Sequence, residues 1–587
     1  MESINIRVGG EAGQGIATVA KIISELVIQK GYSIFSSKEY MSQIKSGHNF
    51  HNIRISNQQV SADVNKINIL VAINKESIIK HHQQVNEKGI VLYDSSINID
   101  DIIPKQNVNY IPINVKEIEN EIKGKNLNNI IYIGSIIKLF NIPLSELIEI
   151  LENKFKNKPE IKSALIKAAE LSYNHFNVLT EIKLPEIKEE KQLIKLFNGN
   201  EIIAKAAIDS GLTFHCQYPM TPVTGILHSL SREATKNDNL TVIQPEDEIA
   251  AINFALGASF AGARSMTASS GGGFALMTES ISLAGMAEIP LVIIEGQRPG
   301  PATGSPTKTE QGDLNFVLNA GHGDFPRIII APGCIKEAYL ETKRAFHLAE
   351  KYQLPVIILI DKHLAESIKS IKFSEKDYNF LKEELSIKRG IINETEIKQN
   401  QLNKNNLFKR YKFNSDSYLR SIPGNENGIF TCTGDDHDET GCITENPKCR
   451  LEGIERREKK LKQILEELDK PKLIGPENAD LTVVSWGSNK GAILEAVENI
   501  NNKTDSEQNK KINVLMVKNM FPFKIEEITK ILNSSNKLVL IENNQSSQLN
   551  QLIKKETCID IKDKILRFDG KTFTVDNVYD ELIKRIN

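Results

Sequence analysis

The chain has 587 residues, of which 40% are hydrophobic and 25% are charged, and its formal net charge is −2. This length corresponds to about three or four domains with buried cores. The near-neutral charge, without a basic stripe, gives no electrostatic basis for binding nucleic acid or an anionic membrane. No apolar run approaches the roughly 20 residues that span a bilayer, and the N-terminus lacks the apolar region of a signal peptide. We therefore expect a soluble protein of the cytoplasm.

The first predicted domain covers residues 1–178. Strand INIRV leads into the glycine turn GGEAGQG and then into a helix whose apolar residues recur with a 3.6-residue period. Apolar strands and helical patterns alternate through the rest of this block, as in an α/β domain. The turn matches neither G-x-G-x-x-G nor the P-loop pattern, because Ile16 stands at the lysine position. It is therefore a weak signal for phosphate binding.

Three further segments follow a linker at residues 179–192, which is charged and contains proline. The strand and helix pattern restarts in residues 193–366 and appears again in residues 477–587. Between them, residues 367–476 are polar and end in a basic helix. The sequence thus predicts the α/β class, with three doubly wound domains joined by polar linkers.

Acids precede a helix of small residues in the stretch QPEDEIAAINFALGASFAGA. Acids in a first turn complement the helix dipole, so ordinary capping explains any one of Glu246, Asp247 and Glu248. The small residues downstream indicate that the helix packs closely on another surface. A carboxylate there loses water, its pKa rises, and it can serve as a catalytic acid. Both interpretations of Glu248 remain open at this level.

Cysteines and histidines give no metal pattern. The six cysteines form no C-x-x-C pair, so we expect no iron–sulfur cluster or zinc ribbon in this chain. His437 has acids on both sides in GDDHDE, but adjacent side chains of one loop rarely converge on one ion. We interpret that loop as polar and near a subunit interface, and we expect no metal ligands.

Five stretches together resemble the α subunit of the 2-oxoacid:ferredoxin oxidoreductases, especially the 2-oxoglutarate type with a γ-type domain fused at its N-terminus. They are YPMTP (218–222), QPEDE to LMTE (244–279), GQRPGPATGSPTKTEQGDL (296–314), GDDHDETGCITENP (434–447) and WGSNKGA (486–492). The resemblance implies a γ-type domain, a thiamine-diphosphate pyrimidine-binding domain and a transketolase-C-like domain, in this order.

The resemblance also implies a reaction. A 2-oxoacid, coenzyme A and oxidised ferredoxin give acyl-CoA, carbon dioxide and reduced ferredoxin, with thiamine diphosphate as cofactor. Mg²⁺, the diphosphate and an iron–sulfur cluster are expected on a separate β subunit in an (αβ)₂ assembly. The absence of a G-D-G signature and of clustered cysteines fits this division. We expect 2-oxoglutarate as substrate, with pyruvate and branched-chain 2-oxoacids as alternatives, and a chain that is inactive alone.

Several site residues follow from the resemblance. Glu248 is expected to hydrogen-bond N1′ of the aminopyrimidine and so to promote removal of the C2 proton. Thr221 is expected to donate to the developing oxyanion, although a plain turn explains it equally well. Arg298, after an apolar strand, is expected to hold the substrate carboxylate, with a surface salt bridge as the alternative.

Weaker expectations concern the residues around these three. Thr307 is expected to support Arg298, and Lys308 to meet the distal carboxylate of 2-oxoglutarate. Tyr218 and Pro222 are expected near the substrate, and the SSGGGF loop near the cofactor through Ser270, Gly271 and Gly272. The first glycine turn is a candidate loop for coenzyme A or another anion, through Gly10, Gly13 and Gly15. One departure is that Lys45 and Ser46 stand where the family often has Arg and Gly.

Two other classes of function compete with this one. A transketolase-like carbon–carbon transferase uses the same pyrimidine-binding architecture, but it requires a diphosphate-binding segment that this sequence lacks. A non-catalytic scaffold chain would be favoured if Glu248, Thr221 or Arg298 were replaced, and all three are present.

Overall fold

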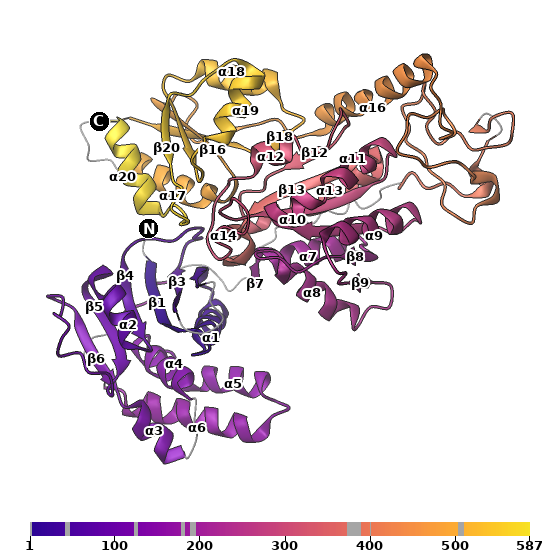
Figure 1. Ribbon diagram of the computed structural model, residues 1–587. Helices are drawn as coiled ribbons and strands as arrows, with labels where there is room; N and C mark the ends of the chain where they lie inside the picture. Colours follow the sequence, from indigo (N-terminus) through magenta and orange to yellow (C-terminus); the bar gives the residue numbers. More distant parts are fainter. Residues whose placement is uncertain are drawn as a thin grey trace.

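The computed structural model describes residues 3–41, 47–122, 127–177, 182–187, 195–371, 389–398, 401–502 and 510–586. Its strands form three sheets, each covered by helices (Figure 1). We call each sheet with its helices the first, middle and third unit. The α/β class predicted from the sequence is confirmed. Lys45 and Ser46, at which the sequence departs from the family pattern, lie outside the described residues.

The first sheet has eight strands in the order β6-β5-β4-β1-β3-β2-β14-β7. They are β1 (Ser3–Glu11), β2 (Ser33–Glu39), β3 (His48–Ser56), β4 (Ile67–Ala72), β5 (Val85–Asp94), β6 (Asn109–Ile113), β7 (Lys195–Asn198) and β14 (Ile368–Ile371). The half from β6 to β1 is parallel and the other half is antiparallel. Strands β7 and β14 come from parts of the chain that flank the middle unit, so the two units are joined within one sheet.

Helices of the first unit bury its mainly aliphatic core against this sheet. They are α1 (Ile16–Gln29), α2 (Lys75–His81), the short 3₁₀ helix η1 (His82–Gln84), α3 (Val115–Ile122), α4 (Asn128–Leu139), α5 (Leu144–Lys154) and α6 (Pro159–His175). Gly15 precedes α1 with a φ of 74°, a left-handed conformation that favours glycine. The glycine turn therefore has a structural explanation at this position.

The middle sheet has the order β18-β12-β13-β11-β10-β8-β9, parallel except for β18. Its strands are β8 (Phe214–Cys216), β9 (Thr241–Ile243), β10 (Ser265–Ser269), β11 (Leu291–Gln297), β12 (Ile328–Ile330), β13 (Pro355–Asp361) and β18 (Asn519–Phe521). Its helices are α7 (Gly199–Asp209), α8 (Thr224–Ala234), α9 (Glu248–Phe260), α10 (Gly271–Leu276), α11 (Thr278–Met286), α12 (Leu314–Leu318), α13 (Ile335–Tyr352) and α14 (Lys362–Glu366). The carboxyl ends of the parallel strands share one edge, where ligands of such sheets bind.

The third sheet has the order β15-β17-β16-β19-β20, parallel except for β15. Its elements are β15 (Leu473–Ile474), β16 (Leu481–Trp486), the short η5 (Gly487–Asn489), α17 (Lys490–Asn501), β17 (Ile512–Val517), α18 (Ile525–Ser534), β19 (Leu538–Glu542), α19 (Gln548–Thr557), β20 (Asp563–Leu566) and α20 (Val575–Ile586). One hydrophobic cluster contains residues of both the middle and the third units, including Trp486 and Phe274. The two units therefore share a core.

Between β14 and α16 (Pro447–Glu467), the described part of the polar connecting segment has little regular structure, apart from the short η2 (Glu394–Glu396) and η4 (Glu426–Gly428). Figure 1 shows this segment beyond one end of the middle unit. It is anchored there by charge, because Arg456 and Lys460 of α16 form buried ion pairs with Glu288 (3.0 and 2.7 Å). Among the described residues, no helix combines the length and the apolar character needed to cross a membrane.

Candidate active site

Glu248 begins α9 and is buried, with 4% of its surface exposed. Asp247 caps the helix, because its carboxylate accepts a hydrogen bond from the Ala250 N–H (2.8 Å), and Glu246 lies exposed ahead of this cap. No donor in the described part of the chain reaches Oε1 of Glu248. Burial raises the pKa of Glu248, and the charge of Asp247 acts in the same direction. The structure thus separates a capping acid from an acid that can retain its proton.

Two carboxylates lie against the glycine turn between β10 and α10. A Cβ atom on Gly273 would lie 2.5 Å from Oε1 of Glu248, and one on Gly271 would lie 2.7 Å from Oδ2 of Asp313. A side chain at either position would force the neighbouring carboxylate to shift, whereas nothing lies within 4 Å of a Cβ on Gly272. The glycines therefore allow both acids to approach the backbone, and they leave the turn open at its middle residue.

The turn also contains an unsatisfied hydroxyl. Ser270 is fully buried, and its Oγ has no hydrogen-bond partner among the residues that the structure describes. Buried polar groups normally have partners. The free atoms of Ser270 and Glu248, next to the open backbone at Gly272, fit a polar cofactor such as the aminopyrimidine of thiamine diphosphate.

Thr221 and Arg298 lie together although 77 positions separate them in the sequence. The Arg298 guanidinium donates a hydrogen bond to the Thr221 carbonyl oxygen (2.8 Å). Pro222, which follows a cis peptide bond, packs on β11, where a Cβ on Gly296 would lie 3.2 Å from Cγ of Pro222. Both Thr221 and Arg298 are half-buried. The structure therefore brings these two predicted residues together at the carboxyl end of a parallel strand.

The weaker candidates have different surroundings. Tyr218 is 36% exposed, and Thr307 is buried. Lys308 forms an ion pair with Glu39 of β2 (2.7 Å) and packs against Gly570 of the third unit. Lys308 thus has a partner in another unit, which makes it a less suitable site for the distal carboxylate of a substrate.

Sequence reasoning missed two carboxyl groups that act on Arg298. Glu295 lies within β11 with no exposed surface, and no N–H or hydroxyl group of the described residues donates to its oxygens. Burial and the nearby Asp313 hold the pKa of Glu295 well above its usual range, and burial raises the pKa of Asp313 to about 6. A signal for Glu295 existed in the sequence, because an acid interrupts the apolar run LVIIEGQ.

Gln311, in the TEQGDL stretch, is hydrogen-bonded to the third unit through its side chain and its backbone. Its buried side chain accepts a hydrogen bond from Asn489 (2.8 Å) and donates to the carbonyl of Trp486 (3.3 Å). Its backbone N–H donates to the carbonyl of Asn543 (2.7 Å). These partners all belong to the third unit. The stretch therefore holds the middle and third units together and sets the position of Asp313, two residues further on.

A cavity of about 550 Å³ lies where the three units meet. Its cationic side chains outnumber its acidic ones, which favours an anionic ligand. The cationic residues are Arg7, Lys38, Lys308, Lys362, Arg567 and Lys571, and the acidic ones are Glu39, Asp63 and Glu366. Burial lowers the pKa of His81 and of His363 to about 3, so both of these lining residues are neutral at physiological pH.

The N-terminal glycine turn is tightly packed. A Cβ on Gly10 would lie 2.7 Å from Oε1 of Gln14, and one on Gly15 would lie 1.9 Å from Nδ2 of Asn129. Gly13, with a φ of 89°, has open space around it. Close packing thus explains Gly10 and Gly15, and a role of this turn in binding an anion stays a prediction.

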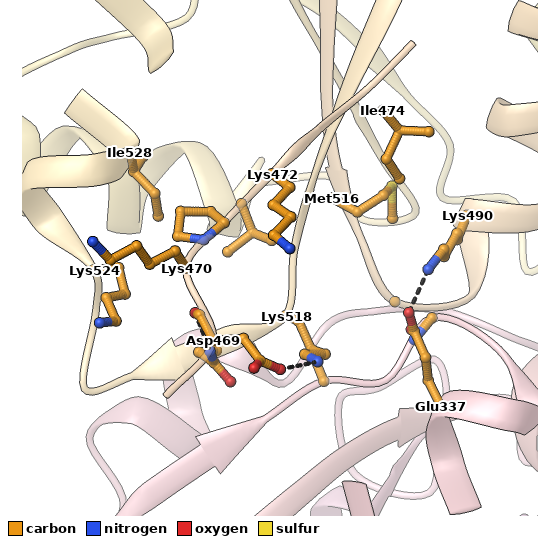
Figure 2. A pocket seen from close by; sticks show the side chains of 16 residues that line it. Glu337, Asp469, Lys470, Lys472, Ile474, Lys490, Met516, Lys518, Lys524 and Ile528 are labelled. Carbon is orange, nitrogen blue, oxygen red and sulfur yellow. Dashed lines mark hydrogen bonds and ion pairs between the residues drawn. The ribbon is translucent and has the colours of Figure 1, made fainter. Parts of the chain in front are cut away.

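A second cavity, of about 680 Å³, lies between the middle and third units (Figure 2). Figure 2 shows Lys490 directed toward Glu337 and Lys518 directed toward Asp469, and both contacts are ion pairs. Acids therefore offset two of the lysines that line this cavity. The Lys490–Glu337 pair links the third unit to α13 of the middle unit, and none of the predicted site residues lines the cavity.

The described residues contain no group of three or more His, Cys, Asp or Glu side chains arranged to hold a metal ion. His437 is buried, donates from Nδ1 to the carbonyl of Asp435 (2.9 Å) and packs at a tilt against Tyr411, with ring centroids 4.1 Å apart. These contacts give the GDDHDE loop a structural role.

Comparisons with known proteins identify the class of enzyme to which these features belong. Residues 205–422 match the family model described as pyruvate flavodoxin/ferredoxin oxidoreductase, thiamine diphosphate-binding, and residues 5–175 match that of pyruvate ferredoxin/flavodoxin oxidoreductase. The fold, the acid at the glycine turn and these matches define a subunit of an oxidoreductase with a thiamine diphosphate-binding domain.

Full-length relatives narrow the class to a family. A 2-oxoacid:ferredoxin oxidoreductase subunit alpha from Sulfolobus is 32% identical over 99% of this chain and 96% of its own length. The chain therefore belongs to the α subunits of the 2-oxoacid:ferredoxin oxidoreductases, which confirms the resemblance of its motifs. It is an enzyme subunit of a multi-subunit complex.

Two further relatives carry more specific names. A 2-oxoglutarate synthase subunit KorA from Methanocaldococcus jannaschii is 33% identical over 53% of this chain and 79% of its own length. The solved structure of a 2-oxoglutarate:ferredoxin oxidoreductase from Magnetococcus marinus, with 2-oxoglutarate, coenzyme A and succinyl-CoA bound, superposes with a TM-score of 0.88. It shares 28% identity, and the match covers 100% of both chains.

Proposed function

We propose that this chain, together with a β subunit, converts 2-oxoglutarate and coenzyme A to succinyl-CoA and carbon dioxide and passes the electrons to ferredoxin. The observation that carries the proposal is the buried Glu248, whose Oε1 has no donor among the described residues, at the open glycine turn of the thiamine diphosphate-binding domain. The names of the Methanocaldococcus and Magnetococcus relatives support 2-oxoglutarate as the substrate. A cytoplasmic location is part of the proposal.

Glu248 is proposed to hydrogen-bond N1′ of the aminopyrimidine. Because burial raises its pKa, the carboxyl group can carry the proton that this bond requires. Ser270, Gly271 and Gly272 are proposed to lie beside the same ring, since Ser270 has a free hydroxyl and the turn is open at Gly272. Bound thiamine diphosphate supplies the carbon nucleophile that attacks the 2-oxo group.

Arg298 is proposed to bind the carboxylate of the substrate, because a guanidinium at the carboxyl edge of a parallel sheet suits a planar anion. Its bond to the Thr221 carbonyl orients the loop, so that the Thr221 hydroxyl can donate to the oxygen of the reacting carbonyl. Thr307, Tyr218 and Pro222 are proposed to line this position. Lys308 remains a candidate for the distal carboxylate only if its pair with Glu39 opens.

Coenzyme A is proposed to enter the cationic cavity between the three units. The excess of positive charge complements its phosphates. Gly10, Gly13 and Gly15 belong to the unit that forms one wall, and the open backbone at Gly13 is the part of that turn available to an anion.

The β subunit is proposed to supply Mg²⁺, the diphosphate site and the iron–sulfur cluster in an (αβ)₂ complex. This chain has no G-D-G signature and no C-x-x-C pair, so it lacks the sequence patterns for these groups. Electrons would therefore leave the complex to ferredoxin through the β subunit.

The test is an anaerobic assay of the complex purified through a tag on this chain. We expect coenzyme A-dependent viologen reduction with 2-oxoglutarate and little with pyruvate or branched-chain 2-oxoacids. Reduction with pyruvate alone would contradict the substrate assignment and leave the reaction class intact. If an iron–sulfur subunit co-purifies and no 2-oxoacid is oxidised, the proposed reaction is wrong.

A further inference from the structure

Two acids that the reaction does not use directly, Glu295 and Asp313, act on Arg298. Partial burial lowers the pKa of the Arg298 guanidinium, and its electrostatic interactions with Asp313 and Glu295 act in the opposite direction. Glu295 lies on β11, three positions before Arg298, and Asp313 follows the Gln311 contact with the third unit. Strand β11 and the loop before α12 thus provide two carboxyl groups that act electrostatically on one cation.

Glu295 is the acid that holds a proton. It has no exposed surface, and no N–H or hydroxyl group of the described residues donates to it, so its ionised form would lose water without replacement. The neighbouring acids Asp313 and Asp361 also favour the neutral form, and only Arg298 opposes them. The proton of Glu295 is thus available for a hydrogen bond to a carboxylate.

Asp313 is the acid that carries the charge. Its backbone N–H donates to Oε1 of Gln297 (3.1 Å), which holds the loop against β11. Burial raises its pKa to about 6, while the hydrogen bond from Glu295 and the charge of Arg298 favour its ionised form. Glu310, another acid near Asp313, has its pKa raised by burial and by the charge of Asp313. At neutral pH, Asp313 is therefore the ionised acid of the pair, and its charge favours the charged form of Arg298.

A substrate carboxylate that binds to Arg298 changes the balance of charge between Arg298 and Asp313. Arg298 neutralises one anion, Asp313, when no substrate is present. A second anion on the same guanidinium places two like charges close together in a half-buried site, which disfavours the ionised form of the weaker acid. Since Glu295 already holds its proton, Asp313 is the group that can accept another.

We propose that the Glu295–Asp313 pair positions Arg298 as its counter-charge, and that Asp313 takes up a proton from solvent when the carboxylate of a 2-oxoacid binds to Arg298. This inference rests on the proposed function, in which Arg298 holds that carboxylate. It follows that 2-oxoacids bind more weakly as the pH rises above about 6, because the proton that binding requires becomes scarcer.

The test is calorimetric titration of the assembled complex at about pH 7, in two buffers of different ionisation enthalpy. The probes are N-oxalylglycine and oxamate, whose amide carbonyls resist attack and whose oxalyl carboxylates mimic that of a 2-oxoacid. We expect uptake of about 0.5 to 1 proton per analogue bound. Asp313→Asn should abolish the uptake. Glu295→Gln is the matched control, because it replaces a neutral acid by a neutral amide and should keep the uptake.

The outcomes separate the two proposals. Binding without proton uptake in the native complex, or equal uptake in the Asp313→Asn complex, overturns the role of the pair and leaves Arg298 as the carboxylate site. Failure of both analogues to bind overturns both proposals. If Asp313→Asn does not fold, the native complex still decides the question. Its Kd should rise by nearly tenfold per pH unit above about pH 6, and a constant Kd between about pH 6 and 8 contradicts the inference.

Discussion

Three neighbouring acids show how position within a helix start separates chemical roles. Asp247 caps α9, Glu246 is exposed, and Glu248 is buried with a free oxygen against Gly273. The same side-chain chemistry therefore yields a structural acid, a solvated acid and a protonatable acid. The difference arises from packing, because burial alone is enough to raise the pKa of a carboxyl group.

Replacing Glu248 by Gln should reduce kcat of the complex by at least about 100-fold, because an amide cannot supply the acid proton. The fold should be retained, since the change removes a carboxyl group whose Oε1 lacks a partner. The measurement is coenzyme A-dependent viologen reduction, with thermal unfolding as the check on folding. Glu246→Gln is the matched control and should keep the native rate. Activity above about a tenth of native in Glu248→Gln would rule out this role.

Individual site residues were predictable to different degrees. Glu248, Thr221 and Arg298 stand within motifs that the family resemblance singles out, and the structure brings the last two into contact. Lys308 stands within such a motif too, yet it pairs with Glu39, far away in the sequence. Glu295 was missed because its environment consists of residues from other segments. Motifs identify residue types, but partners depend on the folded chain.

At the scale of elements, α16 is held by buried charge. Most residues of this helix are polar. Arg456 and Lys460 nevertheless face inward and form ion pairs with Glu288, which has 1% of its surface exposed. Burial alone would raise the pKa of Glu288, but the charges of Arg456 and Lys460 outweigh it and hold the pKa well below its usual range. A polar helix can thus pack tightly when its cations share one buried anion.

Glu288→Gln should therefore destabilise the middle unit by about 3 to 5 kcal/mol, because it leaves buried cations without a partner. Urea unfolding followed by far-UV circular dichroism measures the loss. The native pKa of Glu288 lies below the unfolded value of about 4.3, so its contribution is complete above that pH and disappears as the pH falls further. Glu76→Gln, in the exposed pair with Lys80, is the control and should cost less than about 1 kcal/mol. Equal losses in the two variants would contradict the argument.

At the scale of the whole molecule, strands from one part of the chain extend the sheet of another unit. β7 and β14 extend the first sheet, and β18 of the C-terminal part extends the middle sheet. A buried ion pair between Arg54 of β3 and Glu495 of α17 adds a contact between the first and third units. The cationic cavity is lined by residues of all three units. Its shape therefore depends on how the three units are held together.

Arg54→Met should loosen the contact between the first and third units, because Glu495 would remain buried without a partner, at a cost of about 3 to 5 kcal/mol. Hydrogen exchange should increase around residues 60–65 and 490–496. The double variant Arg54→Met, Glu495→Met should recover most of the protection, since an apolar pair of similar size can replace a buried ion pair. Unchanged exchange in the single variant would show that other contacts hold this interface.

The sequence by itself determined the α/β class and the family, and it indicated Glu248, Thr221 and Arg298 as candidate site residues, because periodic apolar residues and local motifs are written in consecutive residues. Only the folded chain gives these candidates a physical basis, because burial leaves Oε1 of Glu248 without a donor among the described residues, and the fold brings Thr221 to Arg298. The tertiary structure alone decided which strands extend the sheet of another unit, the pair of Lys308 with Glu39, the meeting of Glu295 with Asp313, and the cavity between the units. These features depend on the loss of water from buried groups and on contacts between charges of different segments. Both arise only when the chain folds.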